Sequence, residues 1–318
     1  MKKNNQSEKK KKNISQVSDT DVSVMENPHR SPVTVIGLGP MGQALAGAFL
    51  MNGHPTTLWN RTAEKADYLI SQGATLSNSV TGAVSASPLV IICVLDYNVV
   101  HEVLGPVGDA LKGRTLVNLT ADSPKRAREM ATWAAQHGVD YLDGAIMTPT
   151  PTIGTPAASV LYSGPESIFK VHQPTLASLG GTTSYLGADP GRAAAYDVAL
   201  LDLFWTSMSG YAHALALATA ENIPAKEFAI YAQGIIDILP DIMAYLASEV
   251  DSGHYPGDKS NIISASAGME HIIHAAQHHG LDVSVLSAAM AVTQQAINEG
   301  YGTDGFSRLT ELLKKPSA

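Results

Sequence analysis

Short apolar runs alternate with longer stretches of helical spacing over the first half of the chain. The runs expected to form strands are Val33–Ile36, Thr56–Trp59, Leu89–Leu95, Thr115–Leu119, Tyr141–Ile146 and Ala158–Tyr162. The stretches expected to form helices are Met41–Asn52, Ala63–Gln72 and Pro124–His137. Leu89–Leu95 is apolar without interruption, which is typical of a parallel strand buried on both faces. Because strands that alternate with helices form βαβ units, residues 31–190 are predicted to fold as a doubly wound sheet.

A helical stretch of unusual length follows, covering Ala193–Ala220. At ~1.5 Å per residue it would span roughly 40 Å, and it is apolar on nearly every side, which predicts burial all round. Asp197, Asp202 and His213 lie within it, and such residues argue against a membrane span. We therefore expect a helix that is enclosed between the two subunits of a homodimer.

The two ends of the chain differ in character. Further helices are expected at Ala225–Leu239, Pro240–Val250, Ser264–His279, Val283–Asn298 and Phe306–Lys314. Residues 191–316 are thus predicted to form a long interdomain helix and an all-α domain for dimerisation and substrate binding. Residues 1–30 are rich in Lys, Asn, Ser and Gln and lack the apolar core of a secretory signal, so they are predicted to be a disordered tail.

The composition narrows the class of protein. Hydrophobic residues make up 45% of the 318 residues, which is typical of globular domains. The net charge of −8 disfavours nucleic acid and anionic membranes as partners. Cys93 is the single cysteine, so an internal disulfide is impossible, as expected of a cytoplasmic protein in a reducing compartment.

A glycine-rich segment lies between the first strand and the first helix. It reads Gly37-Leu38-Gly39-Pro40-Met41-Gly42, which is the G-x-G-x-x-G fingerprint of a Rossmann dinucleotide site in its proper setting. Gly37 makes the tight turn, Gly39 lets the backbone approach the pyrophosphate, and Gly42 lets the helix pack closely on the strand. The pyrophosphate would lie at the helix N-terminus, where free N–H groups favour anions. The alternative is an ordinary glycine-rich turn.

The end of the second strand distinguishes NADPH from NADH. An NAD enzyme places Asp or Glu there, about 20 residues into the motif, to bind the ribose hydroxyl. This chain has Asn60, Arg61 and Thr62, with Lys65 one turn further on. Arg61 can bind a 2′-phosphate as a fork, Thr62 can donate a hydrogen bond, and Lys65 adds positive charge. We therefore predict NADPH as cofactor, against the alternative that Arg61 is a solvated surface residue.

Two later strands end in polar residues. Val94, Leu95 and Asp96 follow one strand, and Asn118 and Thr120 end the next. Ligands of doubly wound sheets bind at the carboxyl ends of the strands, so these residues are expected to flank the ribose and the nicotinamide.

The order of the motifs GLGPMG, WNRT, VLD and NLT, followed by a long helix and a helical domain, resembles the 3-hydroxyisobutyrate and 6-phosphogluconate dehydrogenase superfamily from Val33 to about Leu313. Two departures stand out. Hydroxy-acid enzymes of that group have Ser-Gly-Gly after the sixth strand, where this chain reads Asp143-Gly144-Ala145. They also have a catalytic Lys early in the long helix, where this chain has Tyr196-Asp197 and no lysine.

Five segments resemble the imine reductases and reductive aminases: GAIMTPTPTIGTP, LYSG, YLGADPGRAAAYDVALL, SGYAHALAL and DGFSRLTELL. This resemblance implies NADPH-dependent reduction of imines and iminium ions to amines, with reductive amination of ketones or aldehydes by amines as a further activity. It implies an α/β fold with an N-terminal Rossmann sheet, a long interdomain helix and an all-α C-terminal domain exchanged between the subunits of a dimer. It also implies that Asp197 is the catalytic residue. Tyr97 follows Leu95-Asp96 at a strand end and is expected to border the cofactor cleft, which makes it the next catalytic candidate. The alternatives are a 3-hydroxyisobutyrate-type hydroxy-acid dehydrogenase and a non-catalytic NADPH-binding protein.

The chemistry of C=N reduction suits a carboxylate. Hydride transfer is easier once the nitrogen is protonated, so the protein has to supply a proton or stabilise an iminium cation. Asp197 can act as an acid if burial raises its pKa above about 3.9, or as an anion that stabilises the cation. The expected substrate-binding residues are those that share its helix face or its edge, together with one after the sixth strand: Leu201, Phe204, Trp205, Met208 and Met147. Alternatively, Leu201 and Phe204 are core residues.

Three histidines share a helix face, namely His271, His274 and His278. No carboxylate ligand accompanies them, so solvated or interface histidines are expected and no metal site is predicted.

Overall fold

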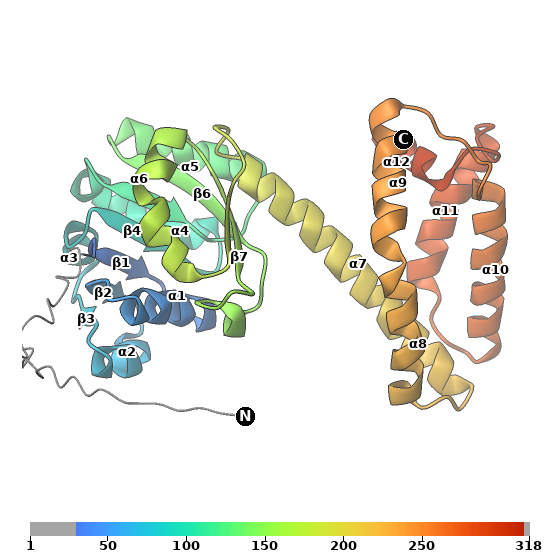
Figure 1. Cartoon of the computed structure of the whole chain (residues 1–318), viewed down its shortest axis with the longest axis horizontal. Coiled ribbons are helices and arrows are strands. Elements are labelled where there is room, and N and C mark those ends of the chain that lie inside the picture. Colours follow the sequence, from blue (N-terminus) through green and yellow to red (C-terminus); the bar gives the residue numbers. More distant parts are fainter. Residues whose placement is uncertain (1–29, 315–318) are drawn as a thin grey trace, which may run out of the picture. The chain divides into compact units, whose positions relative to one another are not determined.

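The computed structural model describes residues 30–314, which form two compact units that divide between Ala195 and Tyr196 (Figure 1). The tail expected over residues 1–30 lies outside the described residues, apart from Arg30.

The first unit is built on an eight-stranded sheet with the order β3-β2-β1-β4-β5-β6-β7-β8. All neighbouring strands are parallel except β6 and β7. The strands are β1 (Val33–Ile36), β2 (Thr56–Trp59), β3 (Thr75–Leu76), β4 (Leu89–Ile92), β5 (Thr115–Asn118), β6 (Asp140–Ile146), β7 (Ser159–Ser163) and β8 (Thr182–Tyr185). The order reverses between β1 and β4, and a doubly wound sheet opens its ligand crevice at such a switch point.

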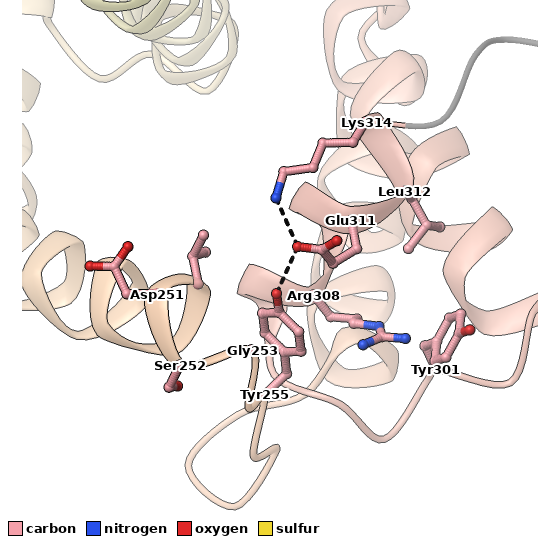
Figure 2. A pocket seen from close by; sticks show the side chains of 10 residues that line it. Asp251, Ser252, Gly253, Tyr255, Tyr301, Arg308, Glu311, Leu312 and Lys314 are labelled. Carbon is pink, nitrogen blue, oxygen red and sulfur yellow. Dashed lines mark hydrogen bonds and ion pairs between the residues drawn. The ribbon is translucent and has the colours of Figure 1, made fainter.

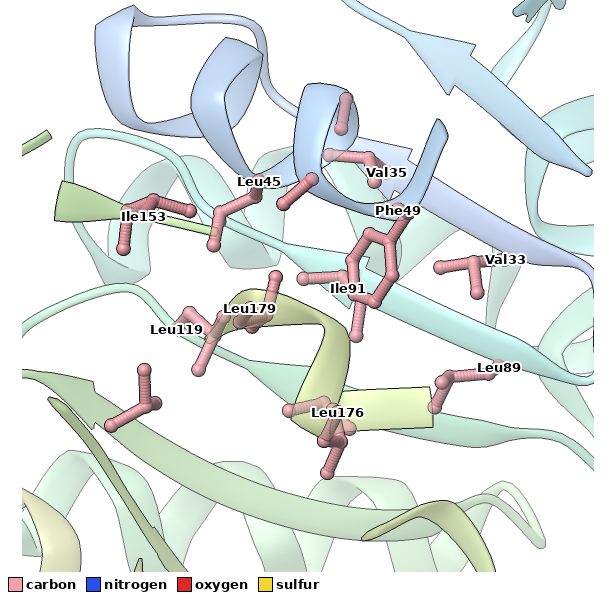
Figure 3. Packing of buried hydrophobic residues seen from close by; sticks show 14 of the residues in the cluster. Val33, Val35, Leu45, Phe49, Leu89, Ile91, Leu119, Ile153, Leu176 and Leu179 are labelled. Carbon is pink, nitrogen blue, oxygen red and sulfur yellow. The ribbon is translucent and has the colours of Figure 1, made fainter. Parts of the chain in front are cut away.

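Helices cover both faces of the sheet, and each face has its own core. One core joins α1 (Pro40–Met51), α2 (Asp67–Ser71) and α6 (Glu166–Leu176) to the strands. Figure 3 shows Phe49 and Leu45 of α1 in this cluster together with Val35 and Ile91. The other core joins α3 (Val80–Ser85), α4 (Tyr97–Leu104) and α5 (Pro124–Gln136) to the opposite face. Burial on both faces explains why the central strands are apolar throughout.

The second unit is helical. Its helices are α7 (Arg192–Ala220, which begins in the first unit), α8 (Ala225–Asp237), α9 (Leu239–Ser252), α10 (Ile262–His278), α11 (Ser284–Asn298) and α12 (Leu309–Leu313). Gly253 ends α9 in the left-handed conformation, and the side chain of Asn261 caps α10 by accepting from the backbone N–H of Ser264. A small core of Ile262, Ala296, Leu309 and Leu312 holds α10, α11 and α12 together.

Large apolar side chains of α7, α8 and α9 are exposed in the single chain. They include Leu200, Leu201, Leu203, Phe204, Trp205, Met208, Ile230, Tyr231, Ile235, Ile236, Ile242 and Met243. Between residues 30 and 314, Ala225–Ser252 is the helical stretch that is long and apolar enough to cross a membrane, judged by length and composition alone. α7 is the helix that the sequence predicts to be enclosed between two subunits, and in one chain much of its apolar surface is uncovered.

The structure differs from the predicted pattern at three points. β4 ends at Ile92 and not at Leu95, because the N–H of Val94 leaves the strand ladder and donates to the Thr120 hydroxyl. Ala63–Gln72 divides into a 3₁₀ turn and the short α2. β7 runs antiparallel to β6, since the connection over residues 147–158 carries three prolines and a single 3₁₀ turn in place of a crossover helix.

The predicted pattern also omitted several short elements. They are β3, α3, α4, α6 and β8. Two of these, α3 and α4, prove to matter for the site.

Candidate functional site

The glycine-rich loop is shaped by contacts that exclude side chains at two of its positions. Gly37 has a φ of 95°, and a Cβ atom there would lie 2.2 Å from the carbonyl oxygen of Cys93. A Cβ atom on Gly42 would lie 1.9 Å from the carbonyl oxygen of Gly37. At Gly39, by contrast, a Cβ atom would meet nothing within 4 Å. The loop is therefore tight where strand and helix meet and open in front of Gly39.

This open space lies at the N-terminus of α1. Gly39 is the N-cap residue and offers no side-chain hydrogen bond, and the first turn of α1 holds no acidic residue. The free N–H groups and the helix dipole therefore face a space that an anion can occupy. The residues fit a dinucleotide pyrophosphate at this position.

A cavity of about 750 Å³ extends from this loop, within the size range of cofactor pockets. The sequence-predicted residues that line it are Gly37, Leu38, Gly39, Pro40, Met41, Gly42, Asn60, Arg61, Thr62, Lys65, Val94 and Leu95. The lining residues that the sequence analysis missed are Trp59, Val80, Thr81, Cys93, Val99, Glu102, Val103, Pro106 and Val107. Most of these belong to α3, α4 and the turn that follows α4, which the pattern did not predict.

Asn60 connects two parts of the cavity wall. Its Oδ1 accepts from the backbone N–H of Leu38 at 2.9 Å, and its Nδ2 donates to the backbone carbonyl of Thr62 at 2.8 Å. The side chain thus ties the glycine-rich loop to the turn after β2 and fixes the place from which Arg61 projects.

Arg61, Thr62 and Lys65 are exposed at the edge of the cavity. Within residues 30–314, neither Arg61 nor Lys65 forms an ion pair with an acidic side chain. Both cations therefore remain available for a phosphate group.

Three predicted cofactor residues do not line the cavity. Asp96 caps α4 by accepting from the N–H of Val99 at 3.0 Å. Asn118 and Thr120 are buried, and the Asn118 Oδ1 accepts from the N–H of Thr120 at 3.0 Å. Thr120 in turn accepts from the N–H of Val94 at 3.1 Å. Their polar atoms hold the loops after β4 and β5, where the sequence analysis expected them to face the cofactor directly.

Tyr97 also points away from the cavity. It is 1% exposed, and its hydroxyl donates to the Asp143 carboxylate at 2.7 Å. Burial, followed by the charge of Asp143, raises the pKa of Tyr97 far above its ordinary value. Tyr97 is predicted from the sequence to border the cofactor cleft, but its hydroxyl turns inward to the buried carboxylate of Asp143.

Asp197 lies near the start of α7. It is 4% exposed, and burial raises its pKa above the ordinary aspartate value. No hydrogen bond or ion pair of this side chain is found within residues 30–314. A buried carboxyl group without such a partner is costly, which is typical of a functional group.

The beginning of α7 is held firmly in the first unit. The buried Ser163 hydroxyl accepts from the N–H of Ala193 at 2.9 Å and donates to the carbonyl of Pro190 at 3.1 Å. Arg128 binds both carboxylate oxygens of Asp189, at 2.9 and 2.7 Å. These contacts fix the first turn of α7, and Asp197 follows Ala193 by about one further helical turn.

The predicted substrate-binding residues fall in both units. Met147 is half-buried after β6 in the first unit. The apolar residues of α7 are exposed in the second unit, where Phe204 and Trp205 make an edge-on contact with ring centroids 5.2 Å apart.

The second unit has a cavity of its own, of about 710 Å³ (Figure 2). Glu311 accepts from Tyr255 and from Lys314, each at 2.9 Å, and the Arg308 guanidinium stacks 4.0 Å from the Tyr301 ring. These groups interact with one another, so we assign them a structural role. In the described part of the chain, no three His, Cys, Asp or Glu side chains are grouped to hold a metal, and His271, His274 and His278 form no such site.

Each of the two units matches the model of a known protein family. Residues 189–315 match the family model of the NADPH-dependent reductive aminase-like C-terminal domain, and residues 32–187 match that of the NAD binding domain of 6-phosphogluconate dehydrogenase. An NADPH-dependent reductive aminase of Aspergillus oryzae is 35% identical over 290 residues, covering 89% of this chain and 97% of that protein.

Two solved structures are similar over nearly the same length. An imine reductase from Bacillus cereus is 39% identical with a TM-score of 0.83, covering 90% of this chain and all of that one. A reductive aminase from Aspergillus terreus, in complex with NADPH4, cyclohexanone and allyl amine, is 36% identical with a TM-score of 0.85, covering 89% and 99%.

Proposed function

The chain belongs to the family of NADPH-dependent reductive aminases and imine reductases, and we propose that it reduces C=N bonds by means of Asp197. Membership of this family assigns to the chain the NADPH-dependent reduction of imines and the formation of amines from carbonyl compounds and amines. The observation that carries our proposal is the burial of the Asp197 carboxyl group, with a raised pKa and no cation beside it in the described part of the chain.

The cavity at the carboxyl ends of the strands fits NADPH. The N-terminus of α1 would hold the pyrophosphate, and Arg61, Thr62 and Lys65 would hold the 2′-phosphate. NADPH supplies the hydride when it is bound. The protein's own task is to hold the nicotinamide and the substrate in place and to supply a proton to the substrate nitrogen.

Asp197 is suited to supplying that proton. An aspartate of ordinary pKa is ionised near neutral pH, whereas burial keeps a larger fraction of Asp197 protonated. After proton transfer the carboxylate faces an iminium cation, which it stabilises. A lysine at this position would repel the same cation, so the replacement suits imines and not hydroxy acids.

A hydroxy-acid dehydrogenase is the alternative activity. It would need a group to bind the substrate carboxylate and a lysine early in α7. β6 leads instead through Asp143, Gly144 and Ala145 to Met147, and α7 contains no lysine. The apolar side chains expected to line the substrate site favour a bulky hydrophobic imine.

Three assays separate these activities. We expect the protein to oxidise NADPH with a cyclic imine, and with cyclohexanone plus allyl amine. We expect no reduction of NADP⁺ with a 3-hydroxy acid. Turnover of the hydroxy acid without turnover of either C=N substrate would contradict the proposal.

The pH dependence tests the acid role of Asp197. The protonated form is complete below the raised pKa and is lost as the pH rises through it. We therefore expect the ratio of kcat/KM in wild type to that in Asp197→Asn to be highest at low pH and to fall at higher pH. The ratio cancels the protonation of the substrate itself. A ratio that rises with pH would mean that the ionised carboxylate is the active form.

We further propose that the protein is a homodimer whose long helices are exchanged between subunits. The support is the exposed apolar surface of α7, α8 and α9, which is larger than single soluble chains normally leave uncovered. Light scattering at micromolar concentration should give twice the mass of the chain. Tyr231→Glu, at a site 73% exposed on α8, should weaken the dimer, whereas Tyr68→Glu, at a site 68% exposed in the first unit, should not. A monomeric wild type would contradict this proposal.

We propose a cytoplasmic location because Cys93 is the single cysteine. The chain therefore cannot form an internal disulfide, as is typical of proteins in a reducing compartment.

A further inference from the structure

A chain of buried polar side chains runs behind the cofactor cavity, from the carboxyl ends of β4 and β5 to the first half of β6. Its members are Tyr97, Asn118, Thr120, Tyr141 and Asp143, each of them at most 5% exposed. Groups of this kind are costly to bury unless they are hydrogen-bonded to one another. Asn118 and Asp143 are direct neighbours in the register of β5 and β6, which explains how residues far apart in sequence meet.

Asp143 forms one end of this chain of hydrogen bonds. Its Oδ1 accepts from the Tyr97 hydroxyl at 2.7 Å and from the Tyr141 hydroxyl at 3.0 Å. The two hydroxyl oxygens lie 3.3 Å apart. Burial and then the charge of Asp143 raise the pKa of both tyrosines, so both hydroxyls keep their protons.

The other end reaches the cavity wall. The Tyr141 hydroxyl oxygen accepts from Asn118 Nδ2 at 3.4 Å, and Asn118 Oδ1 accepts from the N–H of Thr120 at 3.0 Å. The Thr120 hydroxyl then accepts from the N–H of Val94 at 3.1 Å, and Val94 lines the cavity. The carboxylate is thus connected to the loops after both β4 and β5.

A carboxylate at position 143 sets the direction of the hydrogen bonds from the two tyrosine hydroxyls. It can only accept, so the Tyr141 hydroxyl has to donate to it and presents its lone pairs to Asn118. Asn118 must then direct its NH₂ group at Tyr141 and its oxygen at Thr120. An amide at position 143 would be donor as well as acceptor, so the direction of the Tyr141 hydroxyl would no longer be unique and Asn118 Nδ2 could lose its acceptor.

We propose that Asp143 is a positioning residue, whose carboxylate orients Tyr141 and Asn118 and so holds the two loops that flank the nicotinamide end of the cofactor site. This proposal rests on the NADPH site proposed above but not on the role of Asp197. It explains why the Tyr97 hydroxyl is directed at Asp143. It also explains why Asn118 and Thr120 hydrogen-bond to the backbone of the two loops and do not line the cavity themselves.

Amide hydrogen exchange in the protein without cofactor or substrate tests the proposal. In Asp143→Asn we expect the amides of Val94 and Thr120 to exchange about five- to tenfold faster, as for the loss of roughly one buried hydrogen bond. Other amides of the sheet should keep their rates. Asp140→Asn is the matched control, because Asp140 is on the same strand but exposed.

The kinetic result should agree. We expect kcat for a cyclic imine to fall about tenfold in Asp143→Asn, with the dissociation constant of NADPH unchanged within about threefold, since the contacts of Arg61 and the glycine-rich loop remain. A merely structural role would instead lower the stability of the whole first unit and leave kcat per folded molecule unchanged.

Tyr141→Phe provides a second variant in case Asp143→Asn does not fold. It removes the acceptor of Asn118 but leaves the bond from Tyr97 to Asp143, so the same two amides should exchange faster. Unchanged exchange at Val94 and Thr120 in a folded variant would overturn the proposal. An inactive wild type with altered exchange in the variants would contradict the proposed function and not this network.

Discussion

Replacing Asp197 with alanine is expected to lower kcat for a cyclic imine by about a hundred- to ten-thousandfold, the usual range for general acid–base catalysis. Asp197→Asn keeps the size of the side chain but removes the acidic proton and the charge, so it should fall nearly as far. The dissociation constant of NADPH should change little, because the residues that line the cofactor cavity lie in other segments.

The matched control for this prediction is Asp202→Ala. Asp202 is also on α7 but is exposed, so its removal should leave kcat within about twofold of wild type. Near wild-type rates in both Asp197 variants would remove this residue from the chemistry. An equal loss in Asp202→Ala would show that the helix as a whole, and not one carboxyl group, is sensitive to substitution.

Removal of the Arg61 side chain is expected to have the second largest effect. Arg61→Ala should raise the dissociation constant of NADPH by about ten- to a hundredfold, corresponding to the loss of about 1.5–3 kcal/mol for hydrogen bonds to a charged group. The constant for NADH should barely change, because NADH has no 2′-phosphate. Fluorescence titration of both cofactors measures the two constants directly.

Lys125→Ala is the control for the loss of a positive charge. Lys125 is exposed on α5 and does not line the cavity, so its removal should leave both constants unchanged. Equal weakening of NADPH and NADH in Arg61→Ala would show that the residue binds some other part of the cofactor. No weakening at all would place Arg61 outside the site.

The parts of the site that follow local rules could be predicted from the sequence. Gly37 and Gly42 lie where a Cβ atom would collide with a backbone oxygen, and the spacing of the motif alone predicts that glycine is required at both positions. Arg61 lies just after the end of β2, which the motif places about 20 residues along the chain. Asp197 is predicted from the resemblance to known enzymes and from its isolation in an apolar helix, and its role in the reaction stays a prediction.

The direction in which Tyr97, Asn118 and Thr120 point could not be predicted in this way. Tyr97 turns inward because of Asp143, a residue 46 positions away, and the register that brings β5 and β6 together is not visible in local sequence. Residues at strand ends were therefore all assigned to the cofactor, although some of them support the wall from behind.

The helix α4 was missed although it lines the cavity. It has only eight residues, which is short for a periodic signal. Its available signal was Asp96 as an N-cap, followed by Val100 and Leu104 at helical spacing. The polar residues at the ends of β4 and β5 are predicted to contact the cofactor, whereas the side chain of Asp96 caps α4.

The most direct test of the account follows the hydride itself. NADPH carrying deuterium at the transferable position of C4 is incubated with the protein and a cyclic imine, and the product is analysed by mass spectrometry. We expect one deuterium on the carbon of the former C=N bond of the amine product, and none in a sample without enzyme. Unconsumed NADPH, or an amine without deuterium, would contradict the conclusion that this protein reduces imines with NADPH.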